Sequence, residues 1–425
     1  MRNQSGVIFL LFSFLLFLTS INHVFASSLM WTESYGGSFV EIAHSVVQTS
    51  DGGYAIAGST GSYGEGSHLI NSFWLVKTDS SGKIEWNQTY GGLWEDTAYS
   101  LVTTSDGGYA LAGSTESFDA EWHDFWLVKT DSTGNMMWNQ IYGGPGWEKA
   151  YSLIETSDGG YAMAGETFSD YTGNFLVIKT DRNGNMEWNQ TYGGELREIA
   201  YSLVETSDGG YAVAGYTWSF SSGEIDCWLV KINSEGNMQW HQSYGGEGSD
   251  YAYSLIETSD GGYALIGCTN SFGAGENDFY LIKTDSYGNL MWNRTYGGNK
   301  FERAYSLTET SDNGFVLAGE TNSIEGNGFD VWLVKTDATG KMIWNQTYGG
   351  PLEENAYSLD TTSDRGYILA GRIEDSSDYW TNDFLIIKTD EQGNIPEFPS
   401  WIILPFLIFL SSVILITRNK IGKKE

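Results

Sequence analysis

The chain has 425 residues and a formal net charge of −32, from 54 acidic and 22 basic side chains. Such an acidic surface repels phosphate and excludes nucleic acid as a partner. The two cysteines, Cys227 and Cys268, can pair in an oxidising compartment, but we expect two buried free thiols. The stability of the fold must then come from packing.

The first 26 residues have the pattern of a secretory signal peptide. One basic residue, Arg2, precedes an apolar run from Val7 to Leu18, and Ala26 offers a small residue at the cleavage point. We therefore expect residues 1–26 to be removed on export and residues 27–394 to form the mature extracellular domain.

A phrase close to Trp-Asn-Gln-Thr-Tyr-Gly-Gly recurs along the rest of the chain. Its tryptophans are Trp31, Trp86, Trp138, Trp188, Trp240, Trp292 and Trp344. Between the copies stands Ala-Tyr-Ser-Leu-x-Glu-Thr-Ser-Asp-Gly-Gly-Tyr-Ala-x-Ala-Gly, followed by Phe-Trp-Leu-Val-Lys-Thr-Asp-x-x-Gly. A fixed period of this size is typical of a solenoid, a propeller or an array.

Each repeat predicts four antiparallel strands. In the fourth repeat the strands are Tyr201–Thr206, Tyr211–Thr217, Cys227–Ile232 and Met238–Tyr244. Asp-Gly and Gly-Gly pairs supply the positive φ angles of the hairpin turns. The second and third strands are apolar on both faces, which suits sheets stacked between sheets. With no helix signal and no internal proline, the repeat predicts a β-propeller blade.

The count of repeats predicts an all-β fold, a seven-bladed β-propeller of four-stranded antiparallel blades. The chain begins with a lone fourth strand, Trp31–Tyr35, and its last repeat breaks at Ile395-Pro396, where a tryptophan is due. We therefore expect Trp31–Tyr35 to pair with Phe384–Thr389, so that the N-terminal strand closes the ring.

The C-terminal residues have the pattern of a membrane anchor. After a short linker, 395–400, the apolar segment 401–417 is long enough for a transmembrane helix. The basic tail 418–425 places the C-terminus in the cytoplasm. The expected protein is exported and held at the outer face of a membrane.

Lysines and carboxylates also recur in every repeat. The lysines that end the third strands are Lys77, Lys129, Lys179, Lys231, Lys283, Lys335 and Lys388, and the carboxylates that precede the first strands run from Glu41 to Glu354. Seven equivalent positions cannot form one active site, so we interpret them as ion pairs or hydrogen bonds that fix the blade register. The recurring tryptophans are expected in the core.

These phrases resemble known families. Asp79, Gly82 and Trp86 look like the tryptophan-docking turn of quinoprotein-type propellers, and Gly-Gly-Tyr is similar to kelch repeats. The whole pattern over residues 31–394 resembles the tandem propeller repeats of archaeal cell-surface proteins. Pro396, Glu397 and Phe398, before an apolar span and a basic tail, resemble the PEF-type archaeal sorting signal, which implies processing by a sortase-like membrane enzyme. Quinoproteins imply eight blades, calcium and adjacent cysteines, which this sequence lacks, so we expect no cofactor.

The sequence holds few candidates for catalysis. His123 beside Asp124 and Glu121 could bind a metal, but we interpret this segment as a solvated loop and assign no metal site. The arginines fall at scattered repeat positions. Four asparagines begin Asn-x-Thr sequons and are glycosylation candidates: Asn87, Asn189, Asn293 and Asn345.

Function is expected where the repeats differ. The turns after the first and third strands are near-identical, whereas the loops after the second and fourth strands vary, and loops on a constant scaffold are a usual place for binding. The expected ligand-binding residues are Trp94, Trp122, His123, Trp147 and Tyr171, with a surface glycan or a protein as ligand. Two alternatives remain open: an extracellular carbohydrate-active hydrolase or lyase that uses Glu121 and Asp124, and a structural component of the envelope.

Overall fold

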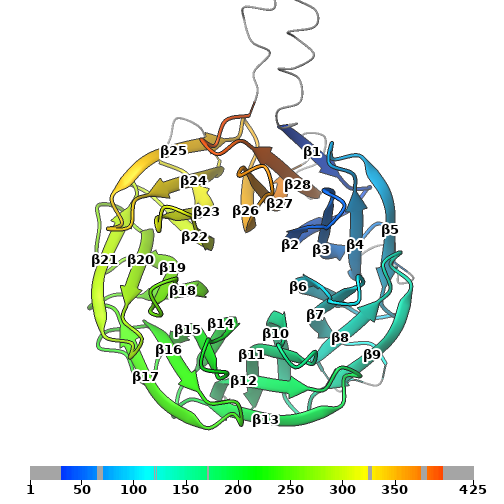
Figure 1. Cartoon of the computed structure of the whole chain (residues 1–425), viewed down its shortest axis with the longest axis horizontal. Coiled ribbons are helices and arrows are strands. Elements are labelled where there is room, and N and C mark those ends of the chain that lie inside the picture. Colours follow the sequence, from blue (N-terminus) through cyan, green and yellow to red (C-terminus); the bar gives the residue numbers. More distant parts are fainter. Residues whose placement is uncertain are drawn as a thin grey trace, which may run out of the picture.

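The computed structural model describes residues 30–64, 70–118, 120, 122–169, 172–323, 328–374 and 381–395. In these residues 28 strands form seven four-stranded antiparallel sheets arranged around a central axis (Figure 1). The predicted seven-bladed β-propeller is confirmed. The expected signal peptide, the sorting motif and the apolar segment 401–417 lie outside the described residues. Within the described ranges, no helix is long and apolar enough to cross a membrane.

Each blade runs from strand a, nearest the axis, to strand d at the rim (Figure 1). The a strands of blades 1 to 7 are β2 (Glu41–Gln48), β6 (Asp96–Thr103), β10 (Trp147–Glu155), β14 (Glu198–Glu205), β18 (Asp250–Glu257), β22 (Glu302–Glu309) and β26 (Glu354–Thr361). The b strands are β3 (Tyr54–Thr60), β7 (Tyr109–Thr115), β11 (Tyr161–Ser169), β15 (Tyr211–Thr217), β19 (Tyr263–Thr269), β23 (Phe315–Thr321) and β27 (Tyr367–Glu374). The c strands are β4 (Ser72–Thr78), β8 (Asp124–Thr130), β12 (Thr172–Thr180), β16 (Asp226–Ile232), β20 (Asp278–Thr284), β24 (Asp330–Thr336) and β28 (Asn382–Thr389). The d strands are β5 (Ile84–Tyr90), β9 (Met136–Tyr142), β13 (Met186–Tyr192), β17 (Met238–Tyr244), β21 (Leu290–Tyr296), β25 (Met342–Tyr348) and, in blade 7, β1 (Trp31–Tyr35).

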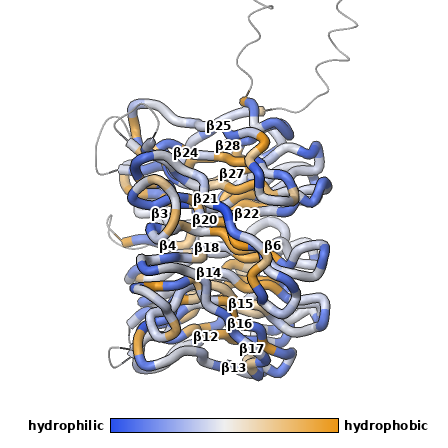
Figure 2. Tube along the Cα trace, turned by 90° about the vertical axis from the view of Figure 1, so that its left-hand side faces the viewer, coloured by the Kyte–Doolittle hydropathy of each residue, from blue (hydrophilic) through white to orange (hydrophobic). Residues whose placement is uncertain are grey.

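The core lies between the blades. Every residue of β15 and β16 is buried, because each sheet is covered on both faces by its neighbours. Figure 2 shows the apolar stretches inside the molecule and hydrophilic turns toward its two faces. Cys227 and Cys268 are both free and buried, as expected. The fold is therefore stabilised by sheet-on-sheet packing without a disulfide.

The N-terminal strand closes the ring, as predicted. β1 pairs antiparallel with β28, with Trp31 opposite Lys388 and Tyr35 opposite Phe384. The first and last blades also meet near the axis, where the Val46 backbone N–H donates to Ser358 Oγ at 3.1 Å. Closure gives the seventh blade the same four strands as the others and covers the outer edge of β28.

A β-bulge interrupts every a strand between an alanine and a serine, as at Ala200 and Ser202 in blade 4. The bulge pushes the backbone of strand a toward strand b. A Cβ added to Gly215 would stand 1.8 Å from the Ile199 carbonyl oxygen, and the equivalent glycines of the other blades meet the same carbonyl. The glycine of the repeated Ala-Gly phrase is thus required by the bulge.

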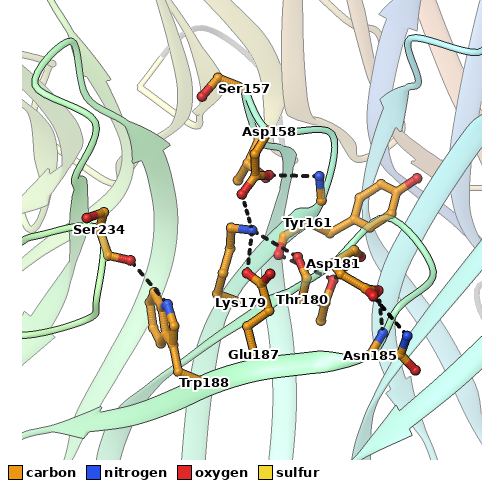
Figure 3. A network of polar contacts seen from close by, with 12 residues as sticks. Ser157, Asp158, Tyr161, Lys179, Thr180, Asp181, Asn185, Glu187, Trp188 and Ser234 are labelled. Carbon is orange, nitrogen blue, oxygen red and sulfur yellow. Dashed lines mark hydrogen bonds and ion pairs between the residues drawn. The ribbon is translucent and has the colours of Figure 1, made fainter.

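The recurring lysines form ion pairs, but with a carboxylate other than the expected one. Each lysine lies 2.8–3.0 Å from the aspartate of its own a–b turn, as Lys179 does from Asp158 (Figure 3). The carboxylates that begin the a strands lie at the opposite ends of the blades. Glu198, for example, accepts from Thr217 Oγ1 at 2.9 Å and from the Gly194 backbone N–H at 3.0 Å. The lysines therefore hold the turns at one face of the propeller, and the a-strand carboxylates hold the loops at the other face.

The recurring tryptophans are half-buried, so their expected place in the core is wrong in degree. They stand on the rim strands, which have only one strand neighbour. Each packs against a ring of the next blade, as Trp188 does edge-on against Tyr211 with centroids 6.0 Å apart. The fully buried indoles belong instead to the c strands, Trp126 and Trp228 among them.

We predict that Gly215→Ala lowers the free energy of unfolding by about 3 kcal/mol, because its methyl group would strike a buried backbone carbonyl. The matched control is Gly144→Ala, where a Cβ would meet nothing within 4 Å. This control should stay within about 0.5 kcal/mol of the parent. Urea unfolding followed by circular dichroism measures both variants, and equal effects would contradict the role of the bulge.

Candidate functional site

The propeller has two unlike faces. The a–b and c–d turns form a constant face, where the same hydrogen bonds recur from blade to blade: Gly209 N–H donates to the Thr206 carbonyl at 2.8 Å, and Gly236 N–H to Asn233 at 3.0 Å. The b–c and d–a loops form a variable face. Of the candidate ligand-binding residues, Trp94, Trp122 and His123 lie in variable-face loops of blade 2, and Trp147 begins β10 of blade 3 at the same face.

A closed ring of aromatic side chains surrounds the axis. Its members are the bulge residues of the seven a strands: His44, Tyr99, Tyr151, Tyr201, Tyr253, Tyr305 and Tyr357. Neighbouring centroids are 4.8–5.7 Å apart all the way round. Because a bulge re-aims its extra side chain, the same backbone irregularity that requires the b-strand glycine also builds this ring.

Beyond the ring, toward the variable face, the repeats diverge. The residue after the b-strand glycine is in turn Ser59, Ser114, Glu166, Tyr216, Cys268, Glu320 and Arg372. The buried Glu166 accepts from Tyr151 Oη at 3.0 Å and from Arg197 Nη2 at 2.8 Å. Sequence reasoning missed this layer, although the position after the glycine, which changes between polar, charged and aromatic residues while most of the b strand stays apolar, was a visible signal.

A second polar cluster of this layer lies in blades 6 and 7. Glu320 accepts from Tyr305 Oη at 3.1 Å and lies 3.7 Å from Arg303 Nη1. Arg372 Nε donates to Asn355 Oδ1 at 2.7 Å, and Asn355 in turn donates to Glu320. Arg303 and Arg372 occupy different repeat positions, and only the fold connects both to Glu320, Arg303 directly and Arg372 through Asn355.

Three of the predicted ligand-binding residues come together. The Trp122 and Trp147 rings lie 6.1 Å apart, and the His123 ring lies 5.8 Å from Trp147. Trp122 is 56% exposed and Trp147 is 47% exposed. Trp94 is exposed as well, but among the described residues it makes no ring contact with this cluster. Tyr171 lies outside the described residues.

His123 differs from the solvated loop that we expected. Its side chain is only 12% exposed, and Nε2 lies 3.0 Å from Glu116 Oε1. Burial, reinforced by the charge of Lys149, lowers the pKa of His123 to about 4. At neutral pH the imidazole is therefore uncharged and can donate one hydrogen bond to Glu116. Burial and then the charge of Glu95 raise the pKa of Glu116.

The structure does not support Glu121 and Asp124 as a catalytic pair or His123 as a metal ligand. Asp124 is buried as the first residue of β8, a position where four other blades also carry aspartate, and Glu121 lies outside the described residues. Within the described part of the chain, no group of three His, Cys, Asp or Glu side chains is placed to hold a metal ion. The sequon asparagines Asn87, Asn189 and Asn345 are exposed on d strands at the rim, and Asn293 is half-buried.

Aromatic residues in the b–c loops also have a structural role that the sequence did not reveal. Tyr63, Phe118, Phe220 and Phe272 each lie over an aromatic side chain of the c strand in their own blade, with centroids 5.2–5.6 Å apart. These half-exposed rings cover the variable-face ends of the blade cores. Exposure alone therefore does not identify a ligand-binding ring.

No protein-family model matches the chain. The regulatory protein FlaEY of Caulobacter vibrioides is 28% identical over 144 residues, a match that covers 30% of this chain and only 15% of FlaEY. Among solved structures, Chaetomium thermophilum Sqt1 bound to the N-terminus of ribosomal protein L10 is similar, with 10% identity and a TM-score of 0.49 over 84% of this chain and 98% of Sqt1. YCF48 bound to a D1 peptide has 12% identity and a TM-score of 0.49 over 86% of this chain and 97% of YCF48. Likeness at these identities is one of fold alone.

We predict that His44→Tyr, which completes a ring of seven tyrosines, reduces the loss of stability in acid. Burial and then Arg372 lower the pKa of His44 from 6.5 to about 4, so the unfolded chain binds a proton that the folded chain refuses. Stability present above pH 6.5 is therefore lost as the pH falls toward 4.

Between pH 7 and pH 4.5 the parent should lose about 2 kcal/mol more than the variant, at about 1.4 kcal/mol per pKa unit. Urea unfolding at both pH values measures this difference. His123 titrates in the same window in both proteins and cancels in the comparison. Identical losses in the two proteins would show that His44 is not held neutral.

Proposed function

We propose that this protein is a binding protein whose macromolecular ligand, a protein or a glycan, docks on the variable face of blades 2 and 3. The main support is the aromatic cluster of Trp122, His123 and Trp147. Trp94, Trp122 and Trp147 are the strongly exposed tryptophans of the described residues. Trp94 and Trp122 lie in loops of blade 2, and Trp147 is the first residue of β10 in blade 3. Exposed tryptophans on a well-packed, rigid fold are typical of binding hot spots.

The surroundings of the cluster support the same function. Leu93 is 70% exposed and Trp94 is 61% exposed, so the d–a loop that leads into blade 2 adds further apolar surface to the same face. Glu95 and Glu116 supply hydrogen-bond acceptors at its edge. The two clustered indole planes are tilted by 39°, which makes a contoured surface rather than a flat platform. A ligand with apolar groups flanked by donors fits this surface.

The location of the protein is part of the proposal. An exported propeller, tethered by the apolar segment 401–417 at the outer face of a membrane, would present this cluster to the exterior. The described chain ends at Ile395, just after the turn Asp390–Gly393 of the constant face. An extended chain covers at most about 3.3–3.6 Å per residue, so a tether of residues 396–400 would be short. The constant face would then look toward the membrane.

We predict that Trp122→Ala and Trp147→Ala each weaken ligand binding by about thirtyfold or more, since truncation of a hot-spot residue costs about 2 kcal/mol. The ligand would be identified by screening residues 27–394 against secreted proteins and envelope glycans. Tyr287→Ala is the matched control, because Tyr287 is 72% exposed on the constant face. Unchanged affinity in both tryptophan variants, with melting temperatures held, would exclude this site.

We predict the orientation from the accessibility of single cysteines on intact cells. Glu195→Cys lies in an exposed d–a loop of the variable face, and Ser80→Cys in an exposed c–d turn of the constant face. The native cysteines are buried and should stay silent. A bulky maleimide should label position 195 several times faster than position 80, and the two should react alike once the protein is released in detergent. The reverse order on cells would contradict the orientation.

A further inference from the structure

Blades 2 and 7 carry the same pair of glutamates. Glu95 and Glu116 of blade 2 stand at the repeat positions of Glu353 and Glu374 in blade 7. The backbone joins each pair in the same way: Glu116 N–H donates to the Glu95 carbonyl, and Glu374 N–H to the Glu353 carbonyl, both at 2.9 Å. Within the described residues, these are the blades in which both positions are acidic.

In blade 7 one member of the pair, Glu353, has a cationic partner from its own blade. Arg372 follows the b-strand glycine, and its Nη2 lies 3.7 Å from Glu353 Oε2. Its Nε donates to Asn355 Oδ1 at 2.7 Å, which fixes the direction of the guanidinium. In blade 7 a planar cation thus stands beside Glu353, one carboxylate of this pair.

Blade 2 lacks this partner. The residues at the positions of Arg372 and Asn355 are Ser114 and Thr97, which pair with each other across β7 and β6 as Arg372 and Asn355 do in blade 7. Neither side chain carries a charge. The charge of Lys149 acts on Glu116, but among the described residues Lys149 makes no ion pair within 4 Å with either glutamate. His123, which does contact Glu116, is neutral at pH 7.

The uncompensated pair lies beside the exposed indoles. His123 joins the two features, because its ring contacts Glu116 on one side and the Trp147 ring on the other. A cation at Glu95 and Glu116 would therefore stand near aromatic rings that attract it further. Apolar side chains flanking that cation would meet Trp122 and Trp147.

We infer that the variable face of blade 2 takes a lysine or arginine side chain of a polypeptide ligand, held by Glu95 and Glu116 at the place that Arg372 takes beside Glu353 in blade 7. This inference rests on the proposed function and specifies its ligand as a basic segment with apolar neighbours. The acidic surface of the protein, with its net charge of −32, favours the approach of such a partner over a neutral glycan.

The test uses a matched pair of probes. The acetylated, amidated peptide Leu-Arg-Leu-Arg-Leu and its counterpart with citrulline in place of arginine differ in charge and hardly in shape. Calorimetric titration of residues 27–394 should show that the arginine peptide binds at least tenfold more tightly, and that its affinity falls about tenfold between 0.05 and 0.5 M NaCl. Equal affinity for both peptides, or no binding of either, would overturn the inference.

Variants of the two blades supply the controls. Glu95→Gln and Glu116→Gln should each weaken the arginine peptide about tenfold and leave the citrulline peptide unchanged. Glu353→Gln, the equivalent change in blade 7, should leave both affinities unchanged. The double variant Thr97→Asn, Ser114→Arg copies blade 7 and should block the arginine peptide; should it fail to fold, Glu95→Gln decides alone. Equal effects of Glu95→Gln and Glu353→Gln would contradict the site.

The failure of this inference can be told from the failure of the proposed function. A screened ligand that needs Trp122 and Trp147 but ignores Glu95→Gln and salt would leave the binding surface in place and reject the basic ligand. A ligand that ignores the tryptophans as well would reject both.

Discussion

Strands b and c of every blade are buried on both faces, and this double burial makes each blade depend on its two neighbours. A blade without a neighbour would expose a whole apolar sheet face, so the array is stable only as a closed ring. The pairing of β1 with β28 satisfies that requirement by building the last blade from both ends of the propeller. The hydrogen bond from the Val46 amide to Ser358 joins the first and last blades at the axis as well. Closure by the N-terminal strand is thus a condition of the fold and also the reason for the offset order of the repeats.

The bulge of strand a adds a second constraint, one that acts inside the blade. It brings a backbone carbonyl against the b strand, where only glycine fits, and it turns one side chain toward the axis. Tyrosine takes that place in six blades, and His44 takes it in the first. The constraint is local, so it repeats without regard to function. The bulge does not restrict the type of the residue after the glycine, and that position carries Glu166, Glu320 and Arg372 in three of the blades. The inner wall therefore varies only where the backbone allows it.

The two faces differ because the turns of one face make contacts that every blade needs, whereas the loops of the other face do not. On the constant face, the aspartate of each a–b turn forms an ion pair with a buried lysine, and each c–d turn packs against the tryptophan of the preceding blade. These contacts require the same residues in every blade. The loops of the variable face lie outside the paired strands and take no part in the contacts of the lysines and tryptophans, and their lengths change between blades. Trp122, His123 and Trp147 occupy this freedom in blades 2 and 3. The same freedom leaves Glu95 and Glu116 without the arginine that blade 7 provides.

The sequence by itself determined the class of fold, the number of blades, the strand order and the closing strand. All of them follow from the period of the repeated phrases and from the strand and turn pattern inside each phrase, which can be recognised without knowing any tertiary contact. It also placed Trp122, His123 and Trp147 on the variable face. Only the tertiary structure decided which side chains meet. It paired the lysines with the turn aspartates rather than with the carboxylates of the a strands, left the recurring tryptophans half-buried at the rim, and separated Trp94 from the cluster. It also joined Arg303 and Arg372 through Glu320 and Asn355, and His123 to Glu116. These contacts join different repeat positions or different blades, and their distances depend on strand pairing, bulges and the alternation of side chains across a sheet, which no repeat phrase encodes.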